Sequence, residues 1–138
     1  MKEKKIRWGI IGLGKIANKF ATDLMTLKNI ELVAVASRNQ QNADDFAHKF
    51  NAKKAYNSYL DLAKDNEVDA VYIATPHSFH KEHTLLCLQN KKAVLCEKPF
   101  AMNLQEVTEM ISVAKENNVL LMEALWTYFL PQYAYLLE

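Results

Sequence analysis

The chain has little glycine, proline or cysteine and no marked excess of charge of either sign. Its 17 basic and 16 acidic residues give a formal net charge of +1, which argues against a dedicated binder of nucleic acid or of acidic membranes. No apolar run approaches the ~18 residues that a membrane-spanning helix needs. The one basic cluster, Lys2, Lys4, Lys5 and Arg7, is interrupted by Glu3, and we interpret it as a solvated terminus.

The two cysteines, Cys87 and Cys96, do not form a Cys-x-x-Cys pair and lie among apolar residues. We therefore expect buried thiols in a reducing, cytoplasmic compartment. The first apolar run is broken by Gly12 and Gly14, which excludes a signal peptide. Half of the 138 residues are apolar and about a quarter are charged, a balance typical of one globular domain with a single core.

Short apolar runs alternate with segments of helical periodicity. Ile16, Phe20, Leu24 and Leu27 mark one helix face, and Ser58 precedes a short helix. Such alternation predicts a parallel sheet covered by helices on both faces, which is the doubly wound α/β or Rossmann fold. Six strands are expected. The first and second lie at 6–11 and 31–36, the third has no assigned range, and the fourth, fifth and sixth lie at 68–74, 93–96 and 119–122.

All three glycines of the chain fall within residues 9–14, where the first expected strand passes into the first helix. Gly12, Gly14 and Ala17 form a G-x-G-x-x-A pattern, in which Gly12 permits a tight turn and Gly14 lets a pyrophosphate approach the backbone. A merely tight strand-to-helix turn is the alternative interpretation. The residues expected to bind the cofactor here are Gly12, Leu13, Gly14, Lys15 and Ile16.

The end of the second strand indicates which dinucleotide is bound. NAD-specific sites usually carry an acid there to hold the ribose 2′-hydroxyl, whereas this chain has Ser37 and Arg38. Ser37 can donate a hydrogen bond to a 2′-phosphate, and Arg38 can neutralise its charge and stack on adenine. The pattern favours NADP(H) over NAD, although a solvated Arg38 at a helix start would also explain it.

Three further strand ends carry polar or aromatic residues. Because parallel strands end at the same edge of the sheet, these residues are expected beside the glycine turn. The segments are Thr75-Pro76-His77-Ser78-Phe79-His80, Glu97-Lys98-Pro99 and Glu123-Ala124-Leu125-Trp126-Thr127.

These motifs, in this order, resemble the glucose-fructose oxidoreductase / inositol dehydrogenase / rhizopine-catabolism (Gfo/Idh/MocA) family. Within it, the chain is most similar to the dimeric dihydrodiol and NADP-linked xylose dehydrogenases. The resemblance implies a two-domain oxidoreductase with residues 1–122 as the dinucleotide-binding domain. Residues 123–138 would then connect to a C-terminal α/β domain that is absent from this chain and would carry the interface of a homo-oligomer.

The resemblance also implies roles for individual residues. Lys98 would be catalytic, lying beside the nicotinamide and bonding the substrate hydroxyl, and a lysine desolvated there could take part in proton transfer. Glu97 would bond the nicotinamide ribose, and Lys98-Pro99 is often a cis peptide in the family. Thr75 and Pro76 would contact the cofactor.

The histidines and Trp126 are open to more than one interpretation. His77 stands where many relatives have Asn, and His80 could touch the cofactor or only start a helix. Trp126 could cover the pyrophosphate and nicotinamide side or belong to an interdomain core. His48 and His83 are expected on helix surfaces, and no residue set has the spacing of a metal site.

The main hypothesis is an NADP(H)-dependent oxidoreductase that moves hydride between the nicotinamide and a hydroxyl or carbonyl of a sugar, polyol or cyclic diol. The alternative is a non-catalytic, dinucleotide-sensing regulator of the same fold. Retention of Lys98 favours the enzyme. The 138 residues alone are expected to bind the cofactor without turnover, and neither nucleic acid nor membrane is an expected partner.

Overall fold

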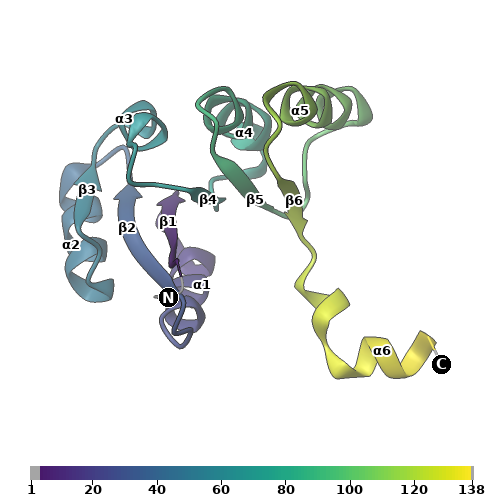
Figure 1. The fold of residues 1–138 in the computed structure, drawn as a ribbon, viewed down its shortest axis with the longest axis horizontal. Helices are drawn as coiled ribbons and strands as arrows, with labels where there is room; N and C mark the ends of the chain where they lie inside the picture. The colour runs from purple at the N-terminus through teal and green to yellow at the C-terminus, as the bar shows by residue number, and fades with distance from the viewer. Residues whose placement is uncertain (1–3, 138) are drawn as a thin grey trace.

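A computed structural model describes residues 4–137, so Lys2, Glu3 and Glu138 lie outside the described residues. Within that range, six parallel strands form one sheet in the order β3-β2-β1-β4-β5-β6 (Figure 1). This topology confirms the predicted doubly wound α/β fold. The strands are β1 Ile6–Ile11, β2 Ile30–Ala36, β3 Lys54–Tyr56, β4 Ala70–Ile73, β5 Ala93–Glu97 and β6 Leu121–Ala124.

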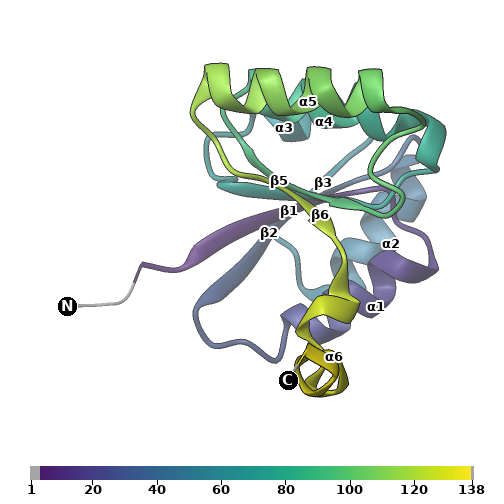
Figure 2. The ribbon, with the colours of Figure 1, turned by 90° about the vertical axis from the view of Figure 1, so that its right-hand side faces the viewer.

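The helices divide between the two faces of the sheet, as Figure 2 shows. α1 and α2 pack on one face around Ile10 and Val35, whereas α3, α4 and α5 pack on the other around Ile11 and Val71. Successive side chains of β1 therefore enter opposite cores, which explains why the strands are apolar throughout. The helices are α1 Lys15–Leu24, α2 Gln40–Phe50, α3 Tyr59–Lys64, α4 His80–Gln89, α5 Leu104–Asn117 and α6 Pro131–Leu137, with short 3₁₀ turns η1 His77–Phe79 and η2 Trp126–Phe129.

β1 has the predicted bounds, β2 and β5 each extend one residue beyond them, and β4 is shorter than the predicted 68–74. The other two strands, β3 and β6, differ in their placement. β3, which had no predicted range, is a three-residue edge strand that pairs with the carboxyl half of β2. β6 lies at Leu121–Ala124 rather than 119–122. Its register is set by β5, because Val94 pairs with Leu121 and Glu97 pairs with Ala124. Both corrections extend the edge of the sheet at which ligands are expected.

The start of β1 is fixed by an ion pair rather than solvated. The Arg7 guanidinium donates two hydrogen bonds to the Asp69 carboxylate, at 3.0 and 2.7 Å, and the Arg7 backbone N–H donates a third at 3.0 Å. Arg7 therefore departs from the expectation of a solvated basic terminus, whereas Lys4 and Lys5 are exposed. This contact joins β1 to the residue that precedes β4.

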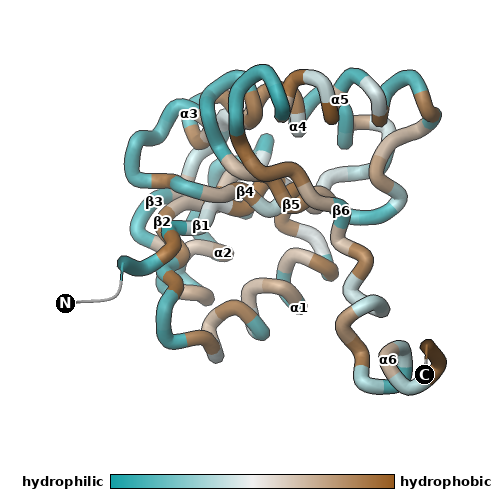
Figure 3. Tube along the Cα trace, turned by 45° about the vertical axis from the view of Figure 1, so that its right-hand side comes forward, coloured by the Kyte–Doolittle hydropathy of each residue, from teal (hydrophilic) through white to brown (hydrophobic). Residues whose placement is uncertain are grey.

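The last segment leaves the sheet. After β6 the chain passes through η2 to α6, which lies apart from the two helical layers in Figure 1. Figure 3 shows hydrophobic stretches along this segment that resemble those of the central strands. Its exposed large apolar side chains are Leu125, Trp126, Tyr128, Phe129, Leu130, Tyr135, Leu136 and Leu137. Among the described residues, no helix is long and apolar enough to cross a membrane.

Candidate dinucleotide-binding site

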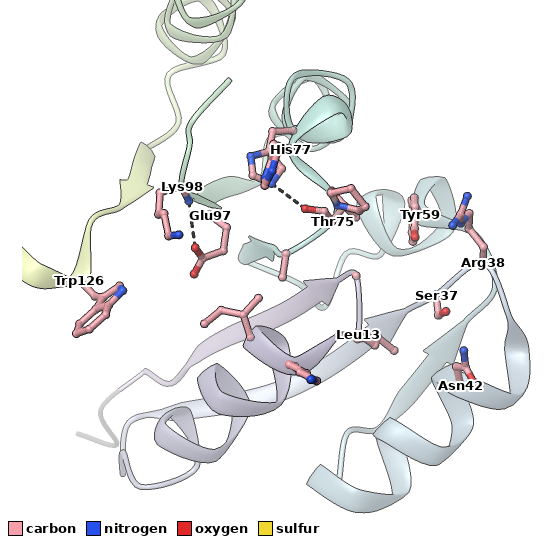
Figure 4. Close-up of a pocket in the computed structure, with 17 residues that line it drawn as sticks. Leu13, Ser37, Arg38, Asn42, Tyr59, Thr75, His77, Glu97, Lys98 and Trp126 are labelled. Atoms are coloured by element: carbon pink, nitrogen blue, oxygen red, sulfur yellow. Dashed lines mark hydrogen bonds between the residues drawn. The ribbon is translucent and has the colours of Figure 1, made fainter. Parts of the chain in front are cut away.

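A cleft of about 720 Å³ lies along the carboxyl ends of the strands. Figure 4 shows side chains from β2, β4 and β5 and from the glycine turn around it. The residues proposed from the sequence that line it are Gly12, Leu13, Gly14, Lys15, Ile16, Ser37, Arg38, Thr75, Pro76, His77, His80, Glu97, Lys98 and Trp126. Three others, Asn42, Tyr59 and Ala74, were not proposed from the sequence.

Gly12 makes the turn after β1 possible. Its φ of +85° lies in the left-handed region, and an added Cβ would lie 2.7 Å from the backbone nitrogen of Thr75. A side chain at this position would therefore be strained and would collide with the chain leaving β4. The geometry agrees with the tight turn predicted for the first glycine of the motif.

Gly14 has a different role, because the space above it is empty. An added Cβ at Gly14 would meet no protein atom within 4 Å, and its φ of −80° suits any residue. Gly14 is the N-cap of α1 and supplies no side chain to the first N–H groups of that helix. The residues present thus fit a pyrophosphate, since an anion could approach these N–H groups without meeting a side chain.

The lining of the cleft favours an anionic ligand electrostatically. Lys15, Arg38 and Lys98 carry positive charge, and Glu97 is the one acid among the described lining residues. Arg38 is exposed, as both a phosphate-binding residue and a solvated residue would be. Among residues 4–137, no carboxylate lines the cleft near the end of β2, where an NAD-specific site usually has one.

Around Arg38, the cleft is shaped by the starts of α2 and α3. The Asn39 side chain caps α2 by accepting from the Asn42 backbone N–H at 3.1 Å. This cap fixes the first turn of α2, from which Asn42 lines the cleft. Tyr59 begins α3, three residues after the end of the short strand β3, and its ring packs edge-on against His83 at 4.7 Å between centroids.

His83 is buried, so the expectation of a surface residue was wrong. Its ring is 8% exposed, and Nδ1 lies 2.9 Å from the Thr75 hydroxyl. Burial lowers the pKa of His83, which favours the neutral ring. A neutral His83 can accept a hydrogen bond from the Thr75 hydroxyl, and this bond fixes Thr75 at the end of β4.

His80 connects two turns that line the cleft. Nε2 of its buried ring lies 2.8 Å from the Thr75 carbonyl oxygen, and Nδ1 lies 2.7 Å from the Pro99 carbonyl oxygen. His80 therefore starts α4 and also lines the cleft, and its contact with a cofactor stays a prediction. Lys98-Pro99 is a cis peptide, as the family resemblance implied.

Glu97 is a buried carboxylate at the end of β5. It is 8% exposed, and its Oε1 accepts a hydrogen bond from the Tyr72 hydroxyl at 2.5 Å. Its Oε2 accepts from the Lys98 backbone N–H at 3.1 Å. Burial and the bond to Glu97 raise the pKa of Tyr72, so its hydroxyl stays protonated and remains a donor.

Lys98 and Trp126 lie at the open side of the cleft. Both side chains are exposed, so residues 4–137 do not by themselves desolvate the Lys98 ammonium. The Glu123 carboxylate stabilises the turn that carries Lys98, because it accepts a hydrogen bond from the Phe100 backbone N–H at 2.9 Å. Trp126 faces the cleft in Figure 4, and its ring is 58% exposed.

Within the part of the chain that the structure describes, no group of three or more His, Cys, Asp or Glu residues could hold a metal ion. Cys87 and Cys96 are buried, as expected. The site therefore consists of a phosphate-binding turn, an exposed arginine, a lysine and one buried carboxylate.

A parallel sheet with a glycine turn and a cleft across its carboxyl edge defines a dinucleotide-binding domain of the Rossmann type. The profile of the family described as "Oxidoreductase family, NAD-binding Rossmann fold" (GFO_IDH_MocA) matches residues 6–125. The chain belongs to this family.

Relatives and solved structures agree with this assignment. The chain is 52% identical over 128 residues to a trans-1,2-dihydrobenzene-1,2-diol dehydrogenase of Mus musculus, covering 91% of this chain and 38% of that protein. The Danio rerio enzyme of the same name is 49% identical with the same coverage. A 3-ketoreductase from Actinomadura kijaniata in complex with NADP and TDP-benzene superposes with a TM-score of 0.92 at 31% identity, covering 96% of this chain and 41% of that one.

A second solved structure, the apo scyllo-inositol dehydrogenase from Lactobacillus casei, has a TM-score of 0.90 at 25% identity. The match covers 99% of this chain and 41% of that enzyme. The chain thus spans about two-fifths of the length of the relatives that it matches.

Proposed function

We propose that this chain is the NADP(H)-binding part of an oxidoreductase that acts on a hydroxyl or carbonyl group of a sugar, polyol or cyclic diol. The observation that carries the proposal is the single cleft edge on which the glycine turn, Arg38, Glu97 and Lys98 meet. The named activities of the relatives, on a dihydrobenzenediol, an inositol and a keto group, support this substrate class.

The preference for NADP(H) rests on the end of β2. Ser37 and Arg38 line the cleft where an acid would repel a 2′-phosphate, and Tyr59 and Asn42 line the same end. NADP is present in the solved 3-ketoreductase, which is consistent with this choice. A guanidinium–phosphate contact is charge-assisted and contributes ~1.5–3 kcal/mol, enough to separate the two cofactors by at least tenfold.

Each residue of the cleft has a proposed task. The N–H groups at the start of α1 hold the pyrophosphate over Gly14, and Glu97 accepts hydrogen bonds from the nicotinamide ribose. The bound nicotinamide supplies or receives the hydride. Lys98 is the proposed catalytic residue: it donates a hydrogen bond to the substrate oxygen and so stabilises the charge that develops there.

The remaining parts of the proposal concern the whole protein. We propose that a second domain covers Trp126 and the open side of the cleft, excludes water from Lys98 and completes the substrate site. That domain would also carry the interface of a homo-oligomer. A small molecule, rather than nucleic acid or membrane, is the proposed partner.

The test is a titration of this chain with NADPH and, separately, with NADH, following energy transfer from tryptophan to the reduced nicotinamide. We expect NADPH to bind at least tenfold more tightly. Arg38→Glu should remove that difference by weakening NADPH alone, with Lys49→Glu on the outer part of α2 as the matched charge control. Equal losses for both cofactors would refute the assignment of Arg38.

A dinucleotide-sensing regulator would give the same titration, so catalysis needs its own measurement. The complete protein should oxidise diols, polyols or sugars with NADP⁺, and Lys98→Met should lower kcat by about 10²-fold or more with little change in cofactor affinity. Tight NADPH binding without turnover on any of these substrate classes would favour the regulator.

A further inference from the structure

Tyr72 is the largest side chain that is fully buried in the described part of the chain, and it lies on β4 between the glycine turn and Glu97. Nothing in its sequence context separates it from the apolar residues beside it. Its ring is 1% exposed and faces the α1 side of the sheet. A strand residue with only a packing role there does not need a hydroxyl group, since a buried hydroxyl costs free energy unless it is bonded.

The Tyr72 hydroxyl has one partner, Oε1 of Glu97, at 2.5 Å. A bond of this length between a phenol and a carboxylate is charge-assisted and therefore directional. The other oxygen of Glu97 accepts from the Lys98 backbone N–H. Each carboxylate oxygen keeps a free lone pair, so Glu97 is oriented and can still accept hydrogen bonds from a ligand in the cleft.

The ring of Tyr72 is itself held by α1. Phe20 stacks on it with centroids 3.8 Å apart and an angle of 18° between the ring planes. Trp8 packs edge-on against Phe20 at 5.5 Å. Phe20 lies on the helix whose first turn follows Gly14, so this stack connects the phosphate-binding helix to the carboxylate at the end of β5.

From this geometry we propose that Tyr72 is a positioning residue for the cofactor. It takes its own position from α1 and orients the Glu97 carboxylate toward the nicotinamide ribose. The inference rests on the proposed function, because Glu97 is taken to bind that ribose. It adds a residue that touches neither cofactor nor substrate and acts only through Glu97.

The experiment compares two ligands on Tyr72→Phe, which removes the hydroxyl and keeps the stacked ring. We expect the Kd for NADPH to rise about tenfold, the loss of one hydrogen bond to a charged group. The Kd for adenosine 2′,5′-bisphosphate, which lacks the nicotinamide ribose, should change by less than about twofold. Tyr56→Phe is the matched control, since it deletes a hydroxyl bonded at 3.0 Å to Asp65, outside the cleft lining.

A double-mutant cycle tests whether Tyr72 acts through Glu97. In a Glu97→Gln background, Tyr72→Phe should cost little further NADPH affinity, because the oriented carboxylate is already gone. An unchanged NADPH Kd in Tyr72→Phe, an equal loss for both ligands, or additive losses in the double variant would overturn the proposal. Wild-type chain that binds neither ligand would instead overturn the proposed function, and this inference with it.

Discussion

The two glycines of the cofactor motif, Gly12 and Gly14, should have opposite effects when changed to alanine. At Gly14 an added methyl group meets no protein atom within 4 Å and the backbone is extended, so the fold should tolerate it. The free energy of unfolding should change by less than ~0.5 kcal/mol. The methyl group projects into the space proposed for the pyrophosphate, so Gly14→Ala should raise the Kd for NADPH by about 10- to 150-fold, equivalent to one charge-assisted hydrogen bond.

At Gly12, unlike Gly14, the main effect of alanine should be on stability. A left-handed φ costs a non-glycine residue ~1–2 kcal/mol, and the new Cβ would lie 2.7 Å from the Thr75 nitrogen. Gly12→Ala should therefore lower the free energy of unfolding by ~2–4 kcal/mol, because backbone cannot move aside as a flexible side chain can.

Urea unfolding followed by circular dichroism measures the free energy of unfolding, and titration with NADPH, followed by tryptophan energy transfer, measures the Kd. The Kd for adenosine 2′-monophosphate should hardly change in Gly14→Ala, since that ligand has no phosphate on its 5′ oxygen. Wild-type affinity for NADPH in a folded Gly14→Ala chain would refute the assignment of the open space above Gly14 to a phosphate.

Three more predictions concern reporters and stability. Trp126→Phe should remove a larger part of the energy transfer to bound NADPH than Trp8→Phe does, because Trp126 lines the cleft and Trp8 packs in the core on the α1 side of the sheet. Asp69→Asn should lower the free energy of unfolding by ~1 kcal/mol at pH 7, a value discounted for the partial exposure of its pair with Arg7. The Arg7 bond lowers the pKa of Asp69 below 3.8, so this stability should be present above that pH and fade as the pH falls further, measured as a closing gap between urea midpoints. Burial lowers the pKa of His83 below 6.5, so the unfolded chain takes up a proton at a higher pH than the folded chain, and stability falls as the pH drops below about 6.5. His83→Gln should therefore show a flatter pH dependence of melting temperature than the wild type. An equally steep dependence would contradict the buried neutral ring.

The fold and most of the cleft were predictable because both follow from local patterns. Continuous apolar strands, a glycine turn and polar strand ends determine which edge carries the site, and parallel pairing then brings Arg38, Thr75 and Lys98 together. The sequence pattern did not locate strand β3, because Lys54–Tyr56 is too short to show a hydrophobic period and pairs on one side only. Without β3, no rule placed Tyr59 at the end of a strand.

Other misses depend on contacts between distant residues. The apolar run at 119–122 includes Leu120, which is 69% exposed, and the strand begins at Leu121 because pairing with β5 decides its register. His83 looked like a surface residue because it is polar, but the Thr75 hydroxyl makes its burial favourable. The partner of the Tyr72 hydroxyl comes from another strand, 25 positions further along the chain.

The burial of the two cysteines has a practical consequence. Burial raises the thiol pKa of Cys87 and of Cys96 to about 12, so at pH 7 only about one thiol in 100,000 is a thiolate. Maleimide reagents attack thiolates, which leaves both native positions unreactive in the folded chain. A single cysteine introduced at exposed Lys64, on α3, would then accept a fluorophore selectively, and any movement of the proposed second domain over the cleft could be followed without a cysteine-free background.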